Sequence, residues 1–361
     1  MKSLAQFRNH RSRIIRALVA AAMVPVMLSG CSSGGPASSN GLTDATLQLN
    51  WITNATWAGS YIADEKGYYK DAGLNVNIQT GGPNVDFMAA LSSGQALVAF
   101  ASMTEPATLN LKGGDFEIVG TMYQKSPLSF ISKAGSGINK PSDLVGKRVG
   151  ISTTALSVWN QFSQTAGIDT SKVKVVPITT GPDPLVAGDI DAYLGFSNEG
   201  PAALSKLGVK SQYFLLQDFG YGYYVNTYTV RKADLKDPAK RKAIKALLKA
   251  DLEGQLQAIK DPALAGKITV DRFGDSLGLD LESETQAARD AARLFYSPTT
   301  EKYGIGYMSG DEMTLSMKTL NSILGTQMPL DGTGYVDMSL LDEIHKEDPS
   351  FGKLPPESTL G

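Results

Sequence analysis

Residues 46–101 read TLQLNWITNATWAGSYIADEKGYYKDAGLNVNIQTGGPNVDFMAALSSGQALVAFA and hold three strand patterns separated by two helix patterns. Residues 46–51 and 74–79 alternate apolar and polar side chains, which is typical of half-buried strands. Residues 96–101 form a short, continuous apolar run, as expected for a strand covered on both faces. The order strand, helix, strand, helix, strand predicts an α/β fold with a parallel, doubly wound sheet.

The same alternation returns further along the chain, and then the pattern changes. Later strand patterns lie at residues 116–122, 148–151, 173–178, 191–196 and 213–217. The last third favours helices instead. One is expected after Asp237, one should contain Met313 and Met317 and end at Gly325, and a third should follow Asp337.

Two α/β units followed by helices suggest two lobes, each doubly wound. Residues 125–133 and 221–231 are extended and aromatic, and we expect these two segments to cross between the lobes as a hinge around a cleft. The expected divisions are lobe 1 at residues 45–130 and 225–361, and lobe 2 at residues 131–224.

The first 30 residues have the pattern of a removable leader. A basic stretch precedes an apolar run at residues 17–28 that is too short to span a bilayer. The run ends in Leu-Ser-Gly-Cys, which resembles the lipobox of bacterial lipoproteins. That resemblance implies cleavage before Cys31, a lipid anchor on its thiol, and an extracytoplasmic protein held at the cell membrane. Residues 31–44 are small and polar at their start, as a flexible tether should be.

Composition excludes several classes of function. The chain has one Cys and two His, so a multi-cysteine zinc site, an iron–sulfur cluster and a His-based metal cluster are all excluded. Without residues 1–30, 29 basic residues face 36 acidic ones, and this net charge of −7 makes nucleic acid a poor partner. We therefore expect no metal, no cofactor and no nucleic-acid partner.

Three stretches together resemble a known family. Residues 51–76 contain A-x-x-K-G-Y-Y-x-x-x-G-L, residues 140–150 read KPSDLVGKRVG, and residues 195–201 read GFSNEGP. These stretches resemble the solute-binding proteins of bacterial ABC importers, in the branch for nitrate, sulfonates, taurine and thiamine-pyrimidine precursors. The resemblance implies a type II periplasmic-binding-protein fold, no catalytic activity, a small-molecule ligand, and an ABC permease with its ATPase as partners. We expect the protein to be a monomer.

The candidate ligand site follows from where α/β sheets bind ligands, beyond the carboxyl ends of their strands. The stretches 46–65, 81–111, 149–171 and 175–205 contain no Lys or Arg. They do contain carboxylates and aromatic rings, namely Asp86, Glu105, Asp183, Asp189, Asp191 and Glu199, with Trp51, Trp57, Tyr61, Trp159, Tyr193 and Phe196. An uncharged or aminated aromatic ring, stacked on side-chain rings and bonded to a carboxylate, fits these residue types.

The residues expected to bind the ligand come from several loops. Trp57 and Tyr61 lie one turn apart at a helix start, and Asn54 precedes them. Trp51 continues the alternation of its strand, so a core position fits it as well. The others are placed at strand ends, in the family-like Asn-Glu pair or on a crossing segment: Ser102, Thr153, Thr154, Asn198, Glu199, Tyr221 and Tyr223.

Other functions remain open from the sequence alone. Backbone N–H groups at helix starts could instead hold a sulfonate or nitrate. A thiamine-pyrimidine synthase-like enzyme shares the fold, but that family is expected to use histidine and a cysteine-rich motif, which this chain lacks. A sensor or adhesion lipoprotein would share the anchor and the fold. The preferred hypothesis is an importer component that binds a thiamine-pyrimidine-precursor-like or flavin-like ring.

Overall fold

The structure is a computed structural model that describes residues 41–179 and 181–360. The expected leader, Cys31 and most of the expected tether lie outside the described residues. The end of that tether, residues 43 and 44, already belongs to the first strand. Among the described helices, none combines the length and apolar character needed to cross a membrane.

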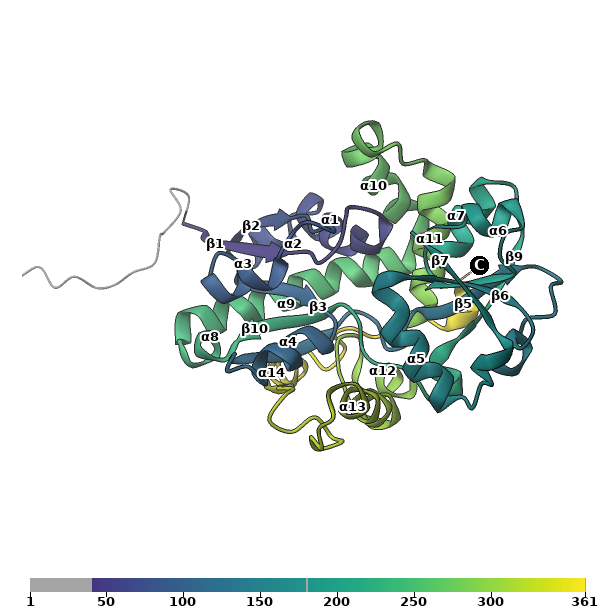
Figure 1. The fold of residues 1–361 in the computed structure, drawn as a ribbon. Helices are drawn as coiled ribbons and strands as arrows, with labels where there is room; N and C mark the ends of the chain where they lie inside the picture. The colour runs from purple at the N-terminus through teal and green to yellow at the C-terminus, as the bar shows by residue number, and fades with distance from the viewer. Residues whose placement is uncertain (1–40, 180, 361) are drawn as a thin grey trace, which may run out of the picture. The chain divides into compact units, whose positions relative to one another are not determined.

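The first sheet has five strands in the order β2-β1-β3-β10-β4. Its strands are β1 (Thr43–Gln48), β2 (Leu74–Gln79), β3 (Val98–Ala101), β4 (Phe116–Thr121) and β10 (Thr227–Arg231). β1 pairs in parallel with β2 and β3, whereas β10 pairs antiparallel with β3 and β4. The carboxyl ends of β1, β2 and β3 therefore meet at one edge of the sheet (Figure 1).

The second sheet repeats this plan in the order β7-β6-β8-β5-β9. Its strands are β5 (Leu128–Lys133), β6 (Arg148–Ser152), β7 (Lys174–Ile178), β8 (Ala192–Phe196) and β9 (Ser211–Leu215). β6 pairs in parallel with β7 and β8, and β5 pairs antiparallel with β8 and β9. We call each sheet with the helices packed on it a lobe, the first lobe and the second lobe.

The expected all-parallel sheets and the expected crossing segments need correction. Of the expected crossing segments, residues 125–127 and 221–226 do link the lobes, whereas residues 128–133 and 227–231 form β5 and β10, the antiparallel strands inside the two sheets. The expected boundary at residue 130 falls within β5. The chain passes between the sheets at residues 122–127 and 216–226 instead. Gln217 accepts a hydrogen bond from the Ser126 backbone N–H at 2.6 Å, which ties these two crossing segments together.

Helices of the first lobe come from both ends of the chain. They are the 3-10 turn η1 (Ala55–Trp57), α1 (Ala58–Glu65), α2 (Tyr68–Asp71), α3 (Phe87–Ser93), α4 (Thr104–Asn110), α8 (Lys232–Lys236), α9 (Pro238–Lys260), α10 (Pro262–Leu277), α11 (Leu281–Ala292), α12 (Pro298–Tyr303), α13 (Gly310–Leu324) and α14 (Ser339–Glu347). The second lobe carries α5 (Leu156–Thr165), α6 (Asp183–Ala187) and α7 (Gly200–Lys206).

The long helix α9 supports the first sheet. Its Ile244, Leu247 and Leu248 lie in one buried cluster with Leu47 and Phe100 of the sheet. Each such side chain contributes about 1.5–3 kcal/mol when it is fully removed from water. α9 also contacts α1, and a Cβ on Gly254 would lie 2.1 Å from the carbonyl oxygen of Gly59. The close helix approach that positions the β1–α1 loop therefore requires glycine at residue 254.

The three expected C-terminal helices are confirmed. Asp237 caps α9 by accepting bonds from the N–H groups of Ala239 and Lys240. α13 ends at Gly325, whose φ of +64° suits a residue without a Cβ. Asp337 accepts a bond from the Ser339 N–H at the start of α14.

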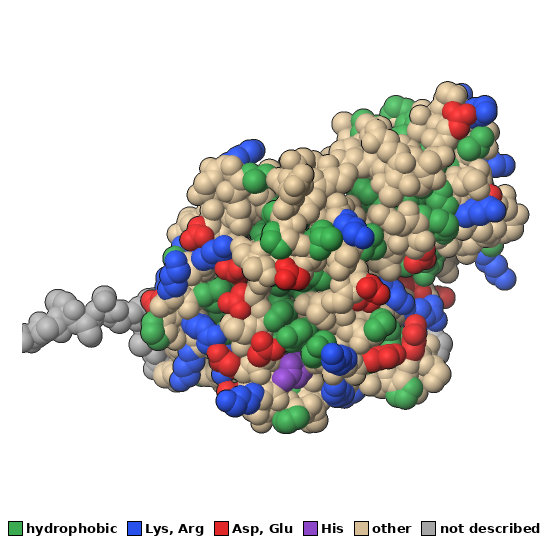
Figure 2. Space-filling model, turned by 90° about the horizontal axis from the view of Figure 1, so that it is seen from below, with side chains coloured by type: hydrophobic (Ala, Val, Ile, Leu, Met, Phe, Trp, Pro, Cys, Tyr) green, Lys and Arg blue, Asp and Glu red, His purple; other side chains and the backbone are tan. Residues whose placement is uncertain are grey.

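Charges of both signs are interspersed on the face that Figure 2 shows. Part of this pattern is an ion-pair network between α9 and α14. Arg241 lies 2.6 Å from Glu343, and Lys245 contacts both Glu343 and Glu347. Such exposed pairs contribute little stability each, and here they engage the basic side chains of Arg241 and Lys245.

Candidate functional site

Loops from the two lobes meet where the strands end. The loop after β1 carries Asn54 and Thr56, and the loop after β8 carries Asn198 and Glu199. Asn54 Nδ2 donates to Glu199 Oε1 at 3.2 Å, and Thr56 Oγ1 lies 3.4 Å from the same oxygen. Asn198 Nδ2 donates to Thr56 Oγ1 at 3.2 Å. We call these four residues the junction site.

Local structure fixes the first-lobe half of the junction site. Asn54 is the N-cap of η1, and its Oδ1 accepts a bond from the Thr56 N–H at 2.9 Å. The same side chain therefore caps the turn with its oxygen and donates to Glu199 with its nitrogen. Ala55, between them, donates its N–H to Glu284 Oε2 of α11 at 2.7 Å. The loop is thus held by three hydrogen bonds before any ligand is considered.

Glu199 keeps one carboxylate oxygen available. Both hydrogen bonds go to Oε1, and among the described residues none donates to Oε2. Desolvation by burial raises the pKa of this carboxyl, while the bonds from Asn54 and Thr56 pull the pKa back toward its usual range. Glu199 is therefore half-buried, and its Oε2 can still accept a hydrogen bond from a ligand.

Further polar atoms at the junction site lack partners. Asn198 is buried, and its Oδ1 has no hydrogen bond within the described chain. The same holds for the phenol oxygens of Tyr123, on the first crossing segment, and Tyr193, on β8. Burial and then the charge of Glu199 raise the pKa of both phenols, so they stay protonated and can donate. Buried polar atoms without partners are costly, and a polar ligand would satisfy them.

The lobes are also tied beside the junction site. α11 of the first lobe contacts α7 of the second, and Lys206 lies 2.9 Å from Asp280 at the start of α11. This ion pair is exposed on both sides and contributes little by itself. The ion pair lies where α7 of the second lobe contacts α11 of the first lobe.

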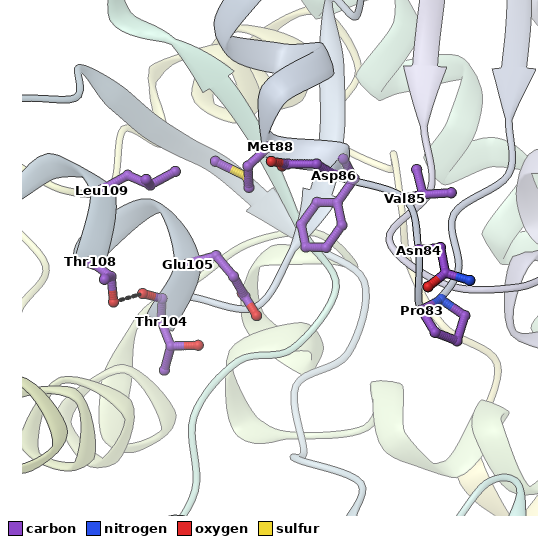
Figure 3. Close-up of a pocket in the computed structure, with 10 residues that line it drawn as sticks. Pro83, Asn84, Val85, Asp86, Met88, Thr104, Glu105, Thr108 and Leu109 are labelled. Atoms are coloured by element: carbon purple, nitrogen blue, oxygen red, sulfur yellow. Dashed lines mark hydrogen bonds between the residues drawn. The ribbon is translucent and has the colours of Figure 1, made fainter. Parts of the chain in front are cut away.

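A pocket of about 630 Å³ lies between α3 and α4 in the first lobe. Figure 3 shows the α4 side chains on one side and the loop residues Pro83, Asn84 and Val85 on the other. Two of its polar groups are already used within their own helices. Asp86 Oδ1 caps α3 by accepting from Ala89 N–H at 2.9 Å, and Thr108 Oγ1 donates to the Thr104 carbonyl at 2.6 Å.

Glu105 is the pocket's unsatisfied group. Its Oε2 is buried and has no hydrogen-bond partner in the part of the chain that the structure describes. Desolvation raises the pKa of this carboxyl to about 7. The carboxyl faces Ser102 and Thr104, and its charge raises the pKa of the neighbouring phenols of Tyr223 and Tyr335. No Lys or Arg lines the pocket among the described residues.

Three of the expected aromatic residues need correction. Trp57 is 1% exposed, packs 5.1 Å from the Phe100 ring, and donates its indole N–H to the Ile52 carbonyl. Tyr61 is also 1% exposed and lies 5.4 Å from the Arg272 guanidinium. Tyr221 is buried in the core of the second lobe. In this structure these three rings are buried among core residues.

Trp51 has the opposite outcome. β1 ends at Gln48, so the strand alternation does not reach residue 51, and the Trp51 side chain is 41% exposed. Phe196, at the end of β8 in the other lobe, is also 41% exposed. Each ring stands three residues before a member of the junction site, Asn54 or Glu199. Both rings are thus exposed aromatic side chains close in sequence to the junction site.

The remaining expected residues fall into two groups. Ser102 and Tyr223 lie next to Glu105, and Tyr223 packs against the cores of both lobes. Thr153 and Thr154 are exposed in the turn that follows β6. The expected ligand-binding residues did not include Tyr123, Glu105, Tyr193 or Phe196, although the last three lie in the stretches without Lys or Arg. Phe196 ends β8 and Glu105 follows β3, and these positions were the available signal.

Comparison with known proteins identifies the family. The model of the NMT1/THI5-like family matches residues 54–265, which is more than half of the chain. The chain belongs to this family. Within the described residues of this NMT1/THI5-like protein, no group of three or more His, Cys, Asp or Glu side chains is arranged to hold a metal ion.

Three relatives of the chain are named for a ligand or an activity. The riboflavin-binding protein RibY of Chloroflexus aurantiacus is 22% identical over 336 residues, 88% of this chain and 95% of the relative. The formylaminopyrimidine-binding protein of Halalkalibacterium halodurans is 25% identical over 206 residues, 55% of this chain and 62% of the relative. A 4-amino-5-hydroxymethyl-2-methylpyrimidine phosphate synthase of Legionella pneumophila is 29% identical over 155 residues, 42% of this chain and 49% of the relative.

Solved structures identify the fold of this NMT1/THI5-like chain. The periplasmic nitrate-binding protein NrtA of Synechocystis superposes with a TM-score of 0.59 at 14% identity, covering 89% of this chain and 91% of that one. The aliphatic sulphonate-binding protein SsuA of Escherichia coli gives 0.58 at 13% identity, covering 78% and 92%. The chain has the periplasmic-binding-protein fold, as the sequence resemblance predicts.

Proposed function

We propose that this NMT1/THI5-like protein is the lipid-anchored solute-binding component of an ABC importer, and that it binds a small aromatic heterocycle, pyrimidine-like or flavin-like, between its two lobes. The observation that carries the proposal is the open Oε2 of Glu199, which lies where the lobes meet, and no cation among the described residues shifts the pKa of its carboxyl. The protein acts outside the cytoplasm, with Cys31 as the anchor residue.

The donors and acceptors at the junction site favour a ring with N–H groups. Glu199 Oε2 and Asn198 Oδ1 are acceptors, while the Tyr123 and Tyr193 hydroxyls can donate. A heterocycle with an amino or imino N–H beside a ring nitrogen or carbonyl meets both kinds of partner at once. A sulfonate or nitrate has only acceptor oxygens and carries a negative charge, so Glu199 would repel it.

Exposed aromatic rings on both lobes fit such a ligand. Trp51 in the first lobe and Phe196 in the second each expose a face near the junction site. Rings stack in offset or tilted arrangements and gain from the apolar area they bury. A ligand held by one ring from each lobe would favour lobe closure, as hinge-type binding proteins require.

The relatives support the same ligand class. One is named for riboflavin and matches over 95% of its length, and another is named for formylaminopyrimidine. Both ligands are nitrogen heterocycles. The structural neighbours named for nitrate and sulphonate share the fold at 13–14% identity, which carries no information about the ligand.

An enzyme on the same fold is the weaker proposal. A synthase-named relative matches 42% of this chain. The junction site offers a carboxylate, amides and phenols, and His345 lies apart from it on α14. These groups support binding, and none is arranged as a nucleophile with a base beside it.

The test is calorimetric titration of the mature protein with riboflavin, 4-amino-5-hydroxymethyl-2-methylpyrimidine, taurine and nitrate. We expect a heterocycle to bind. Glu199→Gln should weaken that binding by about 10–100-fold, because a charged acceptor contributes roughly 1.5–3 kcal/mol to a hydrogen bond. The matched control is Glu117→Gln on β4, whose pKa is also raised by desolvation and which pairs with Lys232.

The anion alternative predicts the opposite sign. If the ligand is a sulfonate, removing the negative charge of Glu199 should tighten its binding. Tighter nitrate binding by Glu199→Gln, together with no binding of either heterocycle, would overturn the proposal.

A further inference from the structure

We propose that the pocket between α3 and α4 is a second part of the ligand site, which receives a hydroxylated or aminated chain attached to the ring, with Glu105 as the acceptor. This inference rests on the proposed function and extends it to the shape of the ligand. It predicts a ligand with two polar ends, a ring edge at Glu199 and a chain at Glu105.

The loop after β2 connects the pocket to the exposed ring of Trp51. Gly81 donates its N–H to the Trp51 carbonyl at 3.0 Å. A Cβ on Gly81 would lie within 2.5 Å of the backbone of residues 49–51, so only glycine permits this contact. Residues 83–87 follow directly and form one wall of the pocket. The loop bonded to the Trp51 backbone therefore leads directly into one wall of the pocket.

The size of the pocket exceeds what a single ring needs. Its volume of about 630 Å³ lies within the roughly 300–1,000 Å³ of pockets that hold drug-sized ligands. The pocket is also open, so a chain could enter it from the ring. A one-ring pyrimidine would leave this volume to water.

The residues that line the pocket indicate which chemical groups the ligand's attached chain can carry. Apolar groups of Val85, Met88 and Leu109 form the walls, and Figure 3 shows Glu105 among them on the α4 side. Since Asp86 and Thr108 already bond within their own helices, the buried Oε2 of Glu105 is the group that lacks a partner. Hydroxyl or amino groups can donate to it. A phosphate or carboxylate chain would be repelled by Glu105 and Asp86.

No Lys or Arg among the described residues that line the pocket offsets the charge of Glu105, although hydrogen bonds from Ser102 and Thr104 lower the pKa of its carboxyl. Ser102 and Thr104 come from its own helix start, Tyr223 from the second crossing segment, and Tyr335 from the loop before α14. The two phenols have raised pKa values and stay neutral. The Tyr335 hydroxyl is already bonded to the Met103 carbonyl. A ligand donor is therefore the missing partner.

The experiment compares riboflavin with lumiflavin, which has the same ring but a methyl group in place of the hydroxylated chain. Flavin fluorescence quenching measures both affinities. The wild-type protein should bind riboflavin at least about 10-fold more tightly than lumiflavin, since one bond to a charged acceptor has about that value. Glu105→Gln should remove most of this difference and change lumiflavin affinity less than about 2-fold.

A second variant tests the pocket without touching its carboxylate. Val85 is 41% exposed, so Val85→Trp can fill the pocket mouth without disturbing the core. It should also weaken riboflavin selectively. Glu117→Gln, outside the pocket, should leave both affinities unchanged.

Each remaining outcome has a separate meaning. Equal losses for both flavins in Glu105→Gln, or no loss in either variant, would overturn the two-part ligand. Binding of the aminopyrimidine without binding of any flavin would also overturn it, while the proposed function would stand. Failure to bind any heterocycle would overturn the proposed function itself.

Discussion

The junction site and the α3–α4 pocket both centre on a glutamate whose pKa is raised by desolvation, yet they are built differently. Glu199 comes from the second lobe and accepts its hydrogen bonds from Asn54 and Thr56 of the first. Glu105 lies in a pocket lined by the first lobe alone. A ligand at Glu199 therefore acts on the contact between lobes, whereas a ligand group at Glu105 acts within one lobe.

Because of this difference, we expect the junction site to affect lobe closure and the α3–α4 pocket to affect which ligand binds. A ligand at the junction site would contact Glu199, whose hydrogen bonds to Asn54 and Thr56 already join the lobes, so we expect binding there to be coupled to the hinge. The pocket can distinguish one ligand from another without changing the hinge. Under the proposal, the two glutamates would serve different purposes, because Glu199 bonds across the lobes and Glu105 lies within one lobe.

The largest expected effect concerns two tryptophans near the junction site. Trp57→Ala should lower the free energy of unfolding by about 3–5 kcal/mol, because it empties a fully buried position against Phe100. Trp51→Ala should change that free energy by less than about 0.5 kcal/mol, since its ring is exposed. It should instead weaken riboflavin binding by roughly 1–3 kcal/mol.

Denaturant unfolding and calorimetry of the two variants make this comparison. The variants serve as controls for each other, because they delete the same side chain from the same loop region. If Trp57→Ala were stable but lost binding, and Trp51→Ala were unaffected, then Trp57 rather than Trp51 would contact the ligand. The ligand ring would then not lie on Trp51.

A double-mutant cycle measures how separate the two sites are. Thr56→Val and Glu199→Ala remove two members of one hydrogen-bonded group, so their effects on riboflavin binding should differ from additivity by about 0.5–3 kcal/mol. Glu105→Ala and Glu199→Ala share no partner among the described residues, and their effects should add within about 0.3–0.5 kcal/mol. Strong coupling in the second cycle would mean that the two carboxylates form a single site.

Much of the fold could be predicted from the sequence because strand alternation is local. β2 has the predicted bounds, and β4, β6, β7 and β8 lie within one residue of theirs. β5 and β10 were misassigned as crossing segments. An extended segment buried on both faces has the same pattern whether it runs between lobes or pairs antiparallel in the middle of a sheet.

The site could be predicted where residues follow the carboxyl ends of strands, because the fold brings such loops together. Asn54, Asn198 and Glu199 were expected and do come together. The sequence favoured Trp57 for the ligand site and left Trp51 open between core and ligand site, because their exposure depends on β1 ending at Gln48 and on Trp57 packing against Phe100. The raised pKa of Glu105 comes from burial by segments that are distant in sequence, among them the loop that carries Tyr335. A local sequence pattern cannot predict such burial.

The smallest expected effect is the pH dependence of stability that Glu105 contributes. Desolvation raises the pKa of its carboxyl from an ordinary value near 4.5 to about 7, so between these values the folded protein binds more protons than the unfolded chain. Stability contributed by this group is therefore present below about pH 4.5 and is lost as the pH rises to about 7. Glu105→Gln does not titrate there. Relative to wild type, the variant should gain on the order of 1 kcal/mol between pH 5 and pH 8, which is about 2–4 °C in melting temperature. Thermal melts of both proteins without ligand check this difference, in which the other carboxyls cancel because the two proteins share them. A gap that stays constant with pH, or that favours the wild type at pH 8, would mean that the carboxylate is already compensated in the folded protein, and the pocket would then have no need of a donor from the ligand.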